Sequence, residues 1–141
     1  MHSRLTMRLT TLAAAAGVWV ALALPVAAHH SFSAEFDAKK VVTLAGEVVM
    51  MEWVNPHSWL HIDVKKPDGS VERWKIEGGS PSVLMRLGWN RNSLPAGTKV
   101  TVVGSQAKDG SLRASSRDLK FPDGRSMDLG GSGSAPQDPK K

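Results

Sequence analysis

The stretch HSWLHIDVKKPDGSVERWKIE, residues 57–77, decides the fold because two alternating apolar segments flank the turn residues PDG. Such a pattern predicts a β-hairpin. If PDG forms a three-residue type I turn with Gly69 in the left-handed region, Lys66 lies opposite Ser70. A two-residue turn would put lysines on the core face, so the pattern favours the longer turn. The resulting core face pairs Leu60 with Ile76, Ile62 with Trp74 and Val64 with Glu72.

The opposite face of this hairpin is polar and aromatic. The same register pairs Trp59 with Glu77, His61 with Lys75, and Asp63 with Arg73, the last as an opposite-charge pair. An exposed indole could stack on a sugar ring, a base or a protein partner, whereas packing against a lysine stem is the structural alternative. The sequence therefore indicates a candidate ligand or partner face made of Trp59, His61, Arg73 and Lys75.

The segments around the hairpin continue the β pattern. Residues 41–54 predict a long strand, with a bulge or bend at Gly46. A short helix is predicted within residues 78–90, with Ser80 as its N-cap and Gly88 at its end.

Two further strands are predicted at residues 98–107 and 112–121. Three strands, one helix and two strands is the element order of the OB-fold. We therefore predict an all-β domain with one short helix, a small five-stranded OB-like Greek-key barrel over residues 41–125.

The two ends of the chain have a different character. In residues 1–28, two arginines precede an apolar run, and VAA places small residues before a cut after Ala28, which predicts a signal peptide. The mature chain is then expected to be periplasmic or secreted, with no membrane association after cleavage. Residues 29–40 are expected to be a polar arm, and residues 126–141 a disordered tail.

The composition and the motifs of the sequence argue against several classes of function. The formal charge is +5, but the basic residues are scattered, and export also argues against a nucleic-acid partner. The chain has no cysteine, so thiol catalysis and thiolate metal sites are excluded. A phosphate loop, a nucleophile elbow and a zinc-hydrolase motif are also absent from the sequence. Binding is therefore favoured over catalysis.

Two histidines follow the predicted cut directly. A mature chain beginning at His29 presents an α-amine and an imidazole together, a chelate that suits Cu(II). His30 is adjacent, and His57 is the candidate for a further ligand. His61 lies four residues from His57 in the same strand, roughly 13 Å away, so the two cannot share one ion. A cut one residue earlier would give Ala-His-His, also a Cu(II) chelate, whereas an unstructured polar terminus is the alternative without a metal.

These patterns lead to one preferred function and two alternatives. The preferred reading is an exported small-ligand-binding domain that binds copper through His29, as a carrier or sensor. The first alternative is an interaction module that uses the Trp59 face to contact an envelope protein or a glycan. The second is a redox enzyme with a terminal-histidine copper site. The sequence does not identify the ligand, the partner or the oligomeric state.

The runs AHHSFSAEFD, LAGEVVMMEWVNPHSWLHIDV, WKIEGGSPSVLMRLGW and AKDGSLRASSRDLKFPDGR resemble a family of small exported bacterial proteins that are known only as a domain of unknown function. Its recognisable parts are the HHSF start, here residues 29–32, the E-W-x-N-P-H motif at 52–57, and the helix region at 79–89. The resemblance implies a periplasmic location and a single small β-barrel domain. It implies no activity, but a family start at HHSF favours a role for the terminal histidines.

Overall fold

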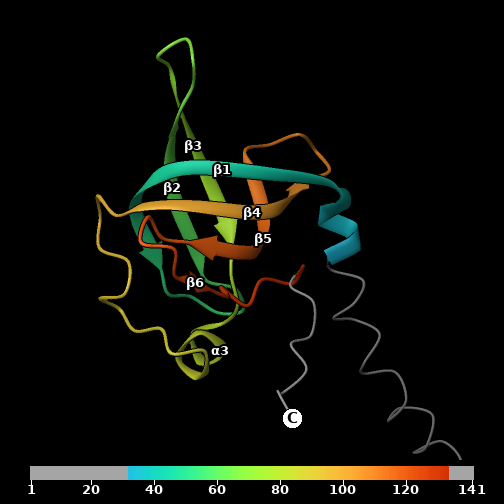
Figure 1. Cartoon of the computed structure of the whole chain (residues 1–141). Coiled ribbons are helices and arrows are strands. Elements are labelled where there is room, and N and C mark those ends of the chain that lie inside the picture. Colours follow the sequence, from blue (N-terminus) through green and yellow to red (C-terminus); the bar gives the residue numbers. More distant parts are fainter. Residues whose placement is uncertain (1–31, 134–141) are drawn as a thin grey trace, which may run out of the picture. The chain divides into compact units, whose positions relative to one another are not determined.

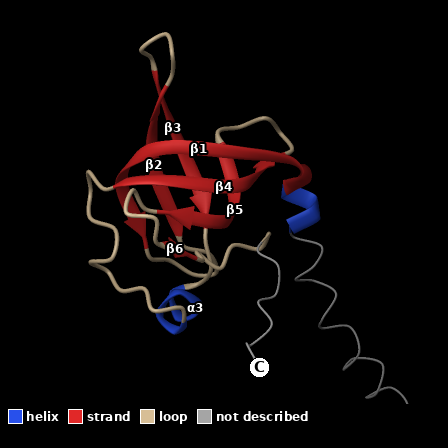
Figure 2. Ribbon diagram, in the orientation of Figure 1, coloured by secondary structure: helices blue, strands red, loops and turns tan. Residues whose placement is uncertain are grey.

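The computed structural model describes residues 32–133, which are predominantly β-structure (Figures 1 and 2). A helical turn at residues 32–35 precedes the first strand. The elements that follow are β1 (Phe36–Glu52), β2 (Trp59–Lys65), β3 (Val71–Glu77), α3 (Pro81–Arg86), β4 (Lys99–Ala107), β5 (Arg113–Lys120) and β6 (Ser126–Met127).

Five of these strands form a closed ring. Antiparallel ladders join β3 to β2, β2 to β1, β1 to β4 and β4 to β5, and a parallel pairing of β3 with β5 closes the ring. With α3 between β3 and β4, this is the predicted OB-like Greek-key order, and the fold-class prediction is confirmed. The short strand β6 was not predicted and extends the sheet from β5.

The hairpin has the predicted register throughout. Trp59 pairs with Glu77, and the ladder continues without a shift to Lys65 opposite Val71. Gly69 has a φ of 84°, the left-handed conformation that glycine adopts at little cost. Beyond the ladder, the Lys66 amide donates to the Ser70 carbonyl at 2.8 Å. The turn chemistry therefore determined which hairpin face is buried.

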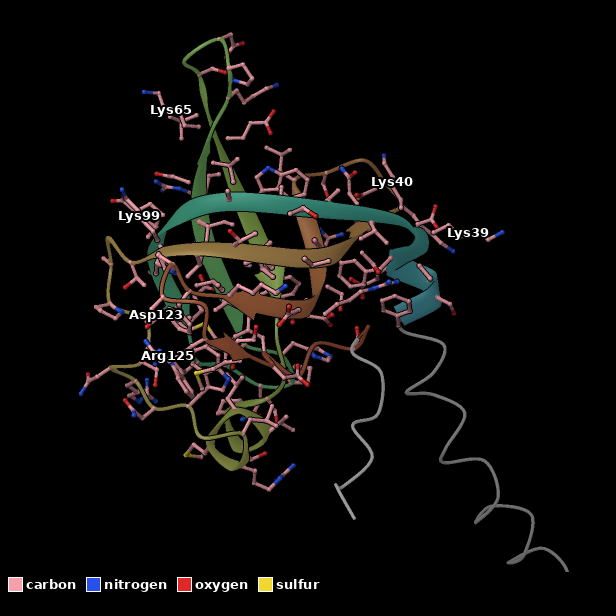
Figure 3. All side chains as sticks on the ribbon, viewed as in Figure 1. Lys39, Lys40, Lys65, Lys99, Asp123 and Arg125 are labelled. Carbon is pink, nitrogen blue, oxygen red and sulfur yellow. The ribbon has the colours of Figure 1, made fainter. Side chains whose placement is uncertain are left out.

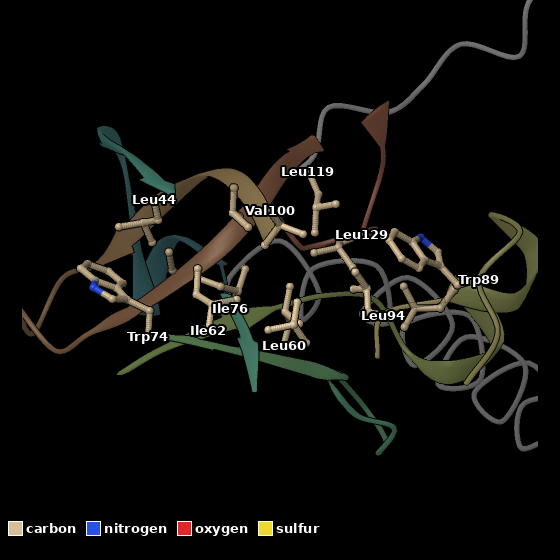
Figure 4. Close-up of a cluster of buried hydrophobic side chains, with 14 residues drawn as sticks. Leu44, Leu60, Ile62, Trp74, Ile76, Trp89, Leu94, Val100, Leu119 and Leu129 are labelled. Carbon is tan, nitrogen blue, oxygen red and sulfur yellow. The ribbon is translucent and has the colours of Figure 1, made fainter. Parts of the chain in front are cut away.

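The core lies inside the ring (Figure 4). In that view, Trp74 and Leu44 lie at one end of the buried cluster, and Trp89 and Leu94 lie at the other. The hairpin supplies the central members Leu60, Ile62 and Ile76, none of which has any exposed surface. Burial of several such side chains, each worth about 1.5–3 kcal/mol, is what holds the strands together.

The short helix also agrees with its predicted signals. Ser80 has extended backbone angles, and its Oγ accepts from the Val83 amide at 3.4 Å. Gly88 follows the helix with a φ of 90°. Only Leu84 of the helix is fully buried. The helix therefore covers the core mainly through this side chain.

Strand β1 differs from its prediction in length and in its irregularity. It begins at Phe36, within the predicted polar arm, because Phe36 is buried and pairs with Ala107 of β4. The register shift in the β1–β2 ladder lies between Val48 and Met50, so the predicted bulge at Gly46 is wrong. Glycine is required at 46 for another reason: a Cβ there would lie 2.7 Å from a backbone oxygen of β2.

The prediction of a disordered tail from residue 126 onward is wrong for its first part. Ser126 and Met127 pair with β5, and Leu129 is fully buried in the core. The Gly79 amide donates to the Leu129 carbonyl at 2.7 Å, and the Trp89 indole donates to the Asp128 carbonyl at 2.7 Å. A single leucine among glycines and serines is a weak local signal, and its burial depends on the space left by distant elements.

Candidate functional site

His57 lies in the loop between β1 and β2, where distant backbone groups determine its position. The next residue, Ser58, donates its amide to the Gly79 carbonyl at 2.9 Å and accepts from the Gly78 amide at 2.8 Å. These bonds attach the loop to the end of β3. They place Nδ1 of His57 3.3 Å from Oε1 of Glu77, the last residue of that strand.

Glu77 is a buried carboxylate, only 5% exposed. Its Oε2 accepts a 2.6 Å hydrogen bond from Ser132, whose hydroxyl also lies 3.2 Å from that of Ser115. The Ser115 hydroxyl in turn accepts from the Gly133 amide at 3.0 Å. A buried charge is costly unless it is paired and hydrogen-bonded. Ser132 provides the direct hydrogen bond to this carboxylate, His57 provides an ionic contact, and Ser115 supports Ser132.

The arrangement around His57 gives its ring two different sides. Nδ1 is buried towards Glu77, yet 36% of the side chain is exposed. The 3.3 Å contact is electrostatic rather than an aligned hydrogen bond. A carboxylate in this position favours the proton on Nδ1 and leaves Nε2 with a lone pair, the form in which imidazole binds metals.

The hairpin register predicts Glu77 opposite Trp59, which the structure confirms, but the sequence pattern indicates no role for it. Local sequence carried no signal for its burial, because Ser115 and Ser132 lie far along the chain. The pairing of β3 with β5 brings Ser115 opposite Glu77, and the segment after β6 adds Ser132. The carboxylate is therefore a functional candidate that only the tertiary structure identifies.

His61 belongs to a second charged group on the outer face of the ring. Its Nε2 lies 3.3 Å from Oε1 of Glu52, and the other oxygen of Glu52 lies 3.4 Å from Nζ of Lys75. Burial of the Glu52 carboxyl acts to raise its pKa, but Lys75 and His61 together outweigh this effect, so the pKa lies below its ordinary value. The His61 side chain is only 16% exposed.

The structure does bring together the four residues of the predicted partner face. The ammonium of Lys75 lies 4.9 Å from the centre of the Trp59 ring, a cation–π contact. Arg73 donates two hydrogen bonds to Asp63, at 2.8 and 2.9 Å. Each of the four residues thus has a partner on the protein itself: Glu52 for His61, Asp63 for Arg73, and one another for Trp59 and Lys75.

Of the three predicted metal ligands, the structure describes only His57. His29 and His30 lie outside the described residues. His57 and His61 each contact a different carboxylate. Within residues 32–133, no three histidine, aspartate or glutamate side chains are grouped as a metal site. His57 with Glu77 is therefore a candidate single ligand with its supporting carboxylate, rather than a complete site.

Comparison with known proteins identifies a family but assigns no activity. A family model described as a family of unknown function, DUF6152, matches residues 16–116. Neither the curated proteins nor the solved structures contain a significant match. Among residues 32–133, none of the helices has the length and apolar character needed to span a membrane.

Proposed function

The chain belongs to DUF6152, a family of unknown function, and we propose that it is an exported ligand-binding domain that binds Cu(II) through the amine and imidazole of His29. The proposal starts from the sequence, in which HHSF directly follows the predicted cut after Ala28. An amine and an imidazole on one residue form a chelate, and nitrogen ligands without thiolate suit Cu(II). The absence of cysteine fits this choice of metal.

One observation in the folded domain supports the proposal most directly: the contact between His57 and Glu77. Metal-binding histidines commonly have their second ring nitrogen against a carboxylate, which fixes the tautomer and raises the basicity of the ligand. His57 has its Nδ1 buried against Glu77 and the rest of its ring partly exposed. We therefore propose His57 as the nitrogen ligand that the folded domain contributes.

His61 is less suited to this role. Its Nε2 already lies against Glu52, and its side chain is less than half as exposed as that of His57. A metal would have to displace the carboxylate that Lys75 also contacts. His61 is thus a matched comparison: both histidines contact a carboxylate, but the side chain of His57 is the more exposed of the two.

The test is a competitive Cu(II) titration of mature protein whose amino terminus has been confirmed by mass spectrometry. We expect one equivalent to bind with a Kd well below about 1 μM. A Gly-Pro dipeptide inserted before His29 should abolish this tight binding. It separates the amine from the imidazole, and because proline has no amide proton, it also prevents the chelate that an Ala-His-His type of terminus would form. His57→Gln should also weaken it, and Glu77→Gln should do so by about 10–100-fold through the orientation of His57.

Two variants serve as controls. His61→Gln and Trp59→Ala should leave Cu(II) affinity unchanged. Tight binding that persists after the Gly-Pro insertion would refute a terminal chelate. In that case, the Trp59 face would become the better candidate, as a contact surface for an envelope protein or glycan. If the insertion abolishes binding but His57→Gln has no effect, the terminus binds copper without help from His57.

A further inference from the structure

A concave region lies on the outer face of the ring, where β1 is paired with both β2 and β4. It is a solvent-open groove of about 650 Å³. Ala45 and Glu47 of β1 line it, together with Asp63 and Lys65 of β2 and Lys99 and Thr101 of β4. Within each strand these residues are two apart, so they share the face opposite the core. The groove is thus separate from the surroundings of His57 and is not part of the proposed copper site.

Small side chains create the depth of the groove. Ala45 pairs with Thr101, and Thr101 pairs with Lys120 of β5, so two short side chains lie next to a row of long ones. Ala45 and Thr101 thus leave a hollow floor that is bordered by the longer side chains of the lysines.

The walls of the groove include apolar surface. Val71, opposite Lys65 at the start of β3, is 58% exposed. Phe121 and Pro122 line the groove from the end of β5. Pockets for small organic ligands combine such apolar surface with a few polar groups that fix orientation. The groove therefore suits a ligand with an apolar body.

The charge of the groove favours an anionic ligand. Three lysines line the groove, and neither Lys65 nor Lys99 has an ion pair within residues 32–133. Lys120 has a long contact of 3.7 Å with Asp118. Of the two lining carboxylates, that of Asp63 is paired with Arg73, whereas Glu47 lies opposite Lys99 in the β1–β4 ladder, so the three lysines leave an excess of positive charge. Figure 3 shows Lys65 and Lys99 on one side of the molecule, away from Lys39 and Lys40.

We propose that this groove binds an amphipathic monocarboxylate. The apolar body covers Ala45, Val71 and Phe121, and the carboxylate lies between the ammonium groups of Lys65 and Lys99. Charge complementarity selects the anion over a neutral or cationic molecule with the same apolar chain. Contact between the apolar floor and the apolar chain provides the part of the affinity that does not depend on the charge of the ligand.

The test uses octanoate, octan-1-ol and octyltrimethylammonium as three probes with the same chain length. Each is titrated into ¹⁵N-labelled mature protein, and amide shifts are followed by NMR. Octanoate should cause saturable shifts at Ala45, Val71 and Thr101, and should bind at least about fivefold more tightly than octan-1-ol. Octyltrimethylammonium should bind more weakly than either.

Three variants separate the contributions of charge and shape. The double variant Lys65→Gln/Lys99→Gln should lose the preference for octanoate and keep the weak binding of octan-1-ol. The matched double variant Lys39→Gln/Lys40→Gln should retain the preference. Ala45→Leu should fill the floor of the groove and weaken the binding of both octanoate and octan-1-ol.

Several results would overturn the proposal: no saturable shifts, shifts that map elsewhere, equal affinity for octanoate and octan-1-ol, or the same loss in both double variants. Cu(II) affinity is measured in parallel on the same samples. Because the groove does not include His57, failure of either proposal leaves the other standing.

Discussion

Individual opposite charges on the outer face of the hairpin are paired across its strands. Asp63 accepts two hydrogen bonds from Arg73, and these bonds, with the positive charge of the guanidinium, hold the pKa of Asp63 below its ordinary value. Both residues keep exposed surface, so the pair adds little to stability by itself. Its larger effect is to occupy Arg73 and to neutralise one carboxylate of the groove.

Arg73→Gln is expected to raise the pKa of Asp63 towards its ordinary value of 3.8, because the charged hydrogen-bond donor is lost. A ¹³C NMR titration of the Asp63 carboxyl measures this directly. Lys66→Gln is the control, since Lys66 pairs with Glu72 and not with Asp63. An Asp63 pKa that is the same in both variants would show that the guanidinium does not determine it.

At the scale of elements, the segment after β5 is as much part of the fold as the strands. It forms β6, buries Leu129 and bonds to the backbone of Gly79. Its Ser132 also provides a hydrogen bond to the buried carboxylate of Glu77. This segment therefore joins the core to the candidate site.

Leu129→Ala should lower the free energy of unfolding by about 2–5 kcal/mol, the range for deletion of a fully buried leucine side chain. Urea unfolding followed by tryptophan fluorescence provides the measurement. Leu112→Ala is the matched control: Leu112 is 37% exposed, and we expect its loss to cost less than about 1 kcal/mol. Equal losses in the two variants would contradict the role assigned to this segment.

At the scale of the whole molecule, the described carboxyls with a resolved pKa shift all have pKa values below their ordinary ones. They are Glu52, Asp63, Asp68, Glu72, Asp109 and Asp123. Such a group stabilises the folded chain fully above its unfolded-state pKa, and the contribution is lost as the pH falls through the lower folded-state pKa. These six groups therefore act in the same direction.

We expect the urea midpoint to be insensitive to these groups at neutral pH and to fall below about pH 4.5, where the unfolded chain binds protons first. The measurement is a series of urea titrations between about pH 7 and pH 2.5. A Lys75→Gln variant removes one cation next to Glu52 and should lose less stability over that acid range. A midpoint that stays constant down to pH 3 would refute the prediction.

Much of the fold was predictable because its signals are local. Alternation of apolar residues and the PDG turn predicted the hairpin register, and Ser80 and Gly88 predicted the helix ends. The predictions of strand boundaries and of the bulge were wrong where the environment of a residue is formed by segments distant in the sequence. Phe36 begins β1 because it finds a buried position beside β4, and the bulge lies at Val48–Met50 rather than at the only glycine of the strand.

The candidate site was predictable in part. The sequence alone identified His57 as a candidate ligand and placed Trp59, His61, Arg73 and Lys75 on one face, because a strand period of two determines which side chains share a face. It left open which histidine has an accessible ring and gave no role to Glu77. The setting of Glu77 depends on Ser132, with Ser115 beside it, and no local pattern connects either serine to Glu77 or His57.

By itself, the sequence determined the element order, the hairpin register and the buried face, since these follow from side-chain periodicity and turn geometry over short distances. Only the tertiary structure decided that the ring closes through β3 and β5, that Leu129 enters the core, and that a carboxylate is buried against His57. It also created the lysine-lined groove at Ala45. The physical reason is that burial and electrostatic pairing depend on neighbours in space, which the closed ring brings together from positions far apart in the chain.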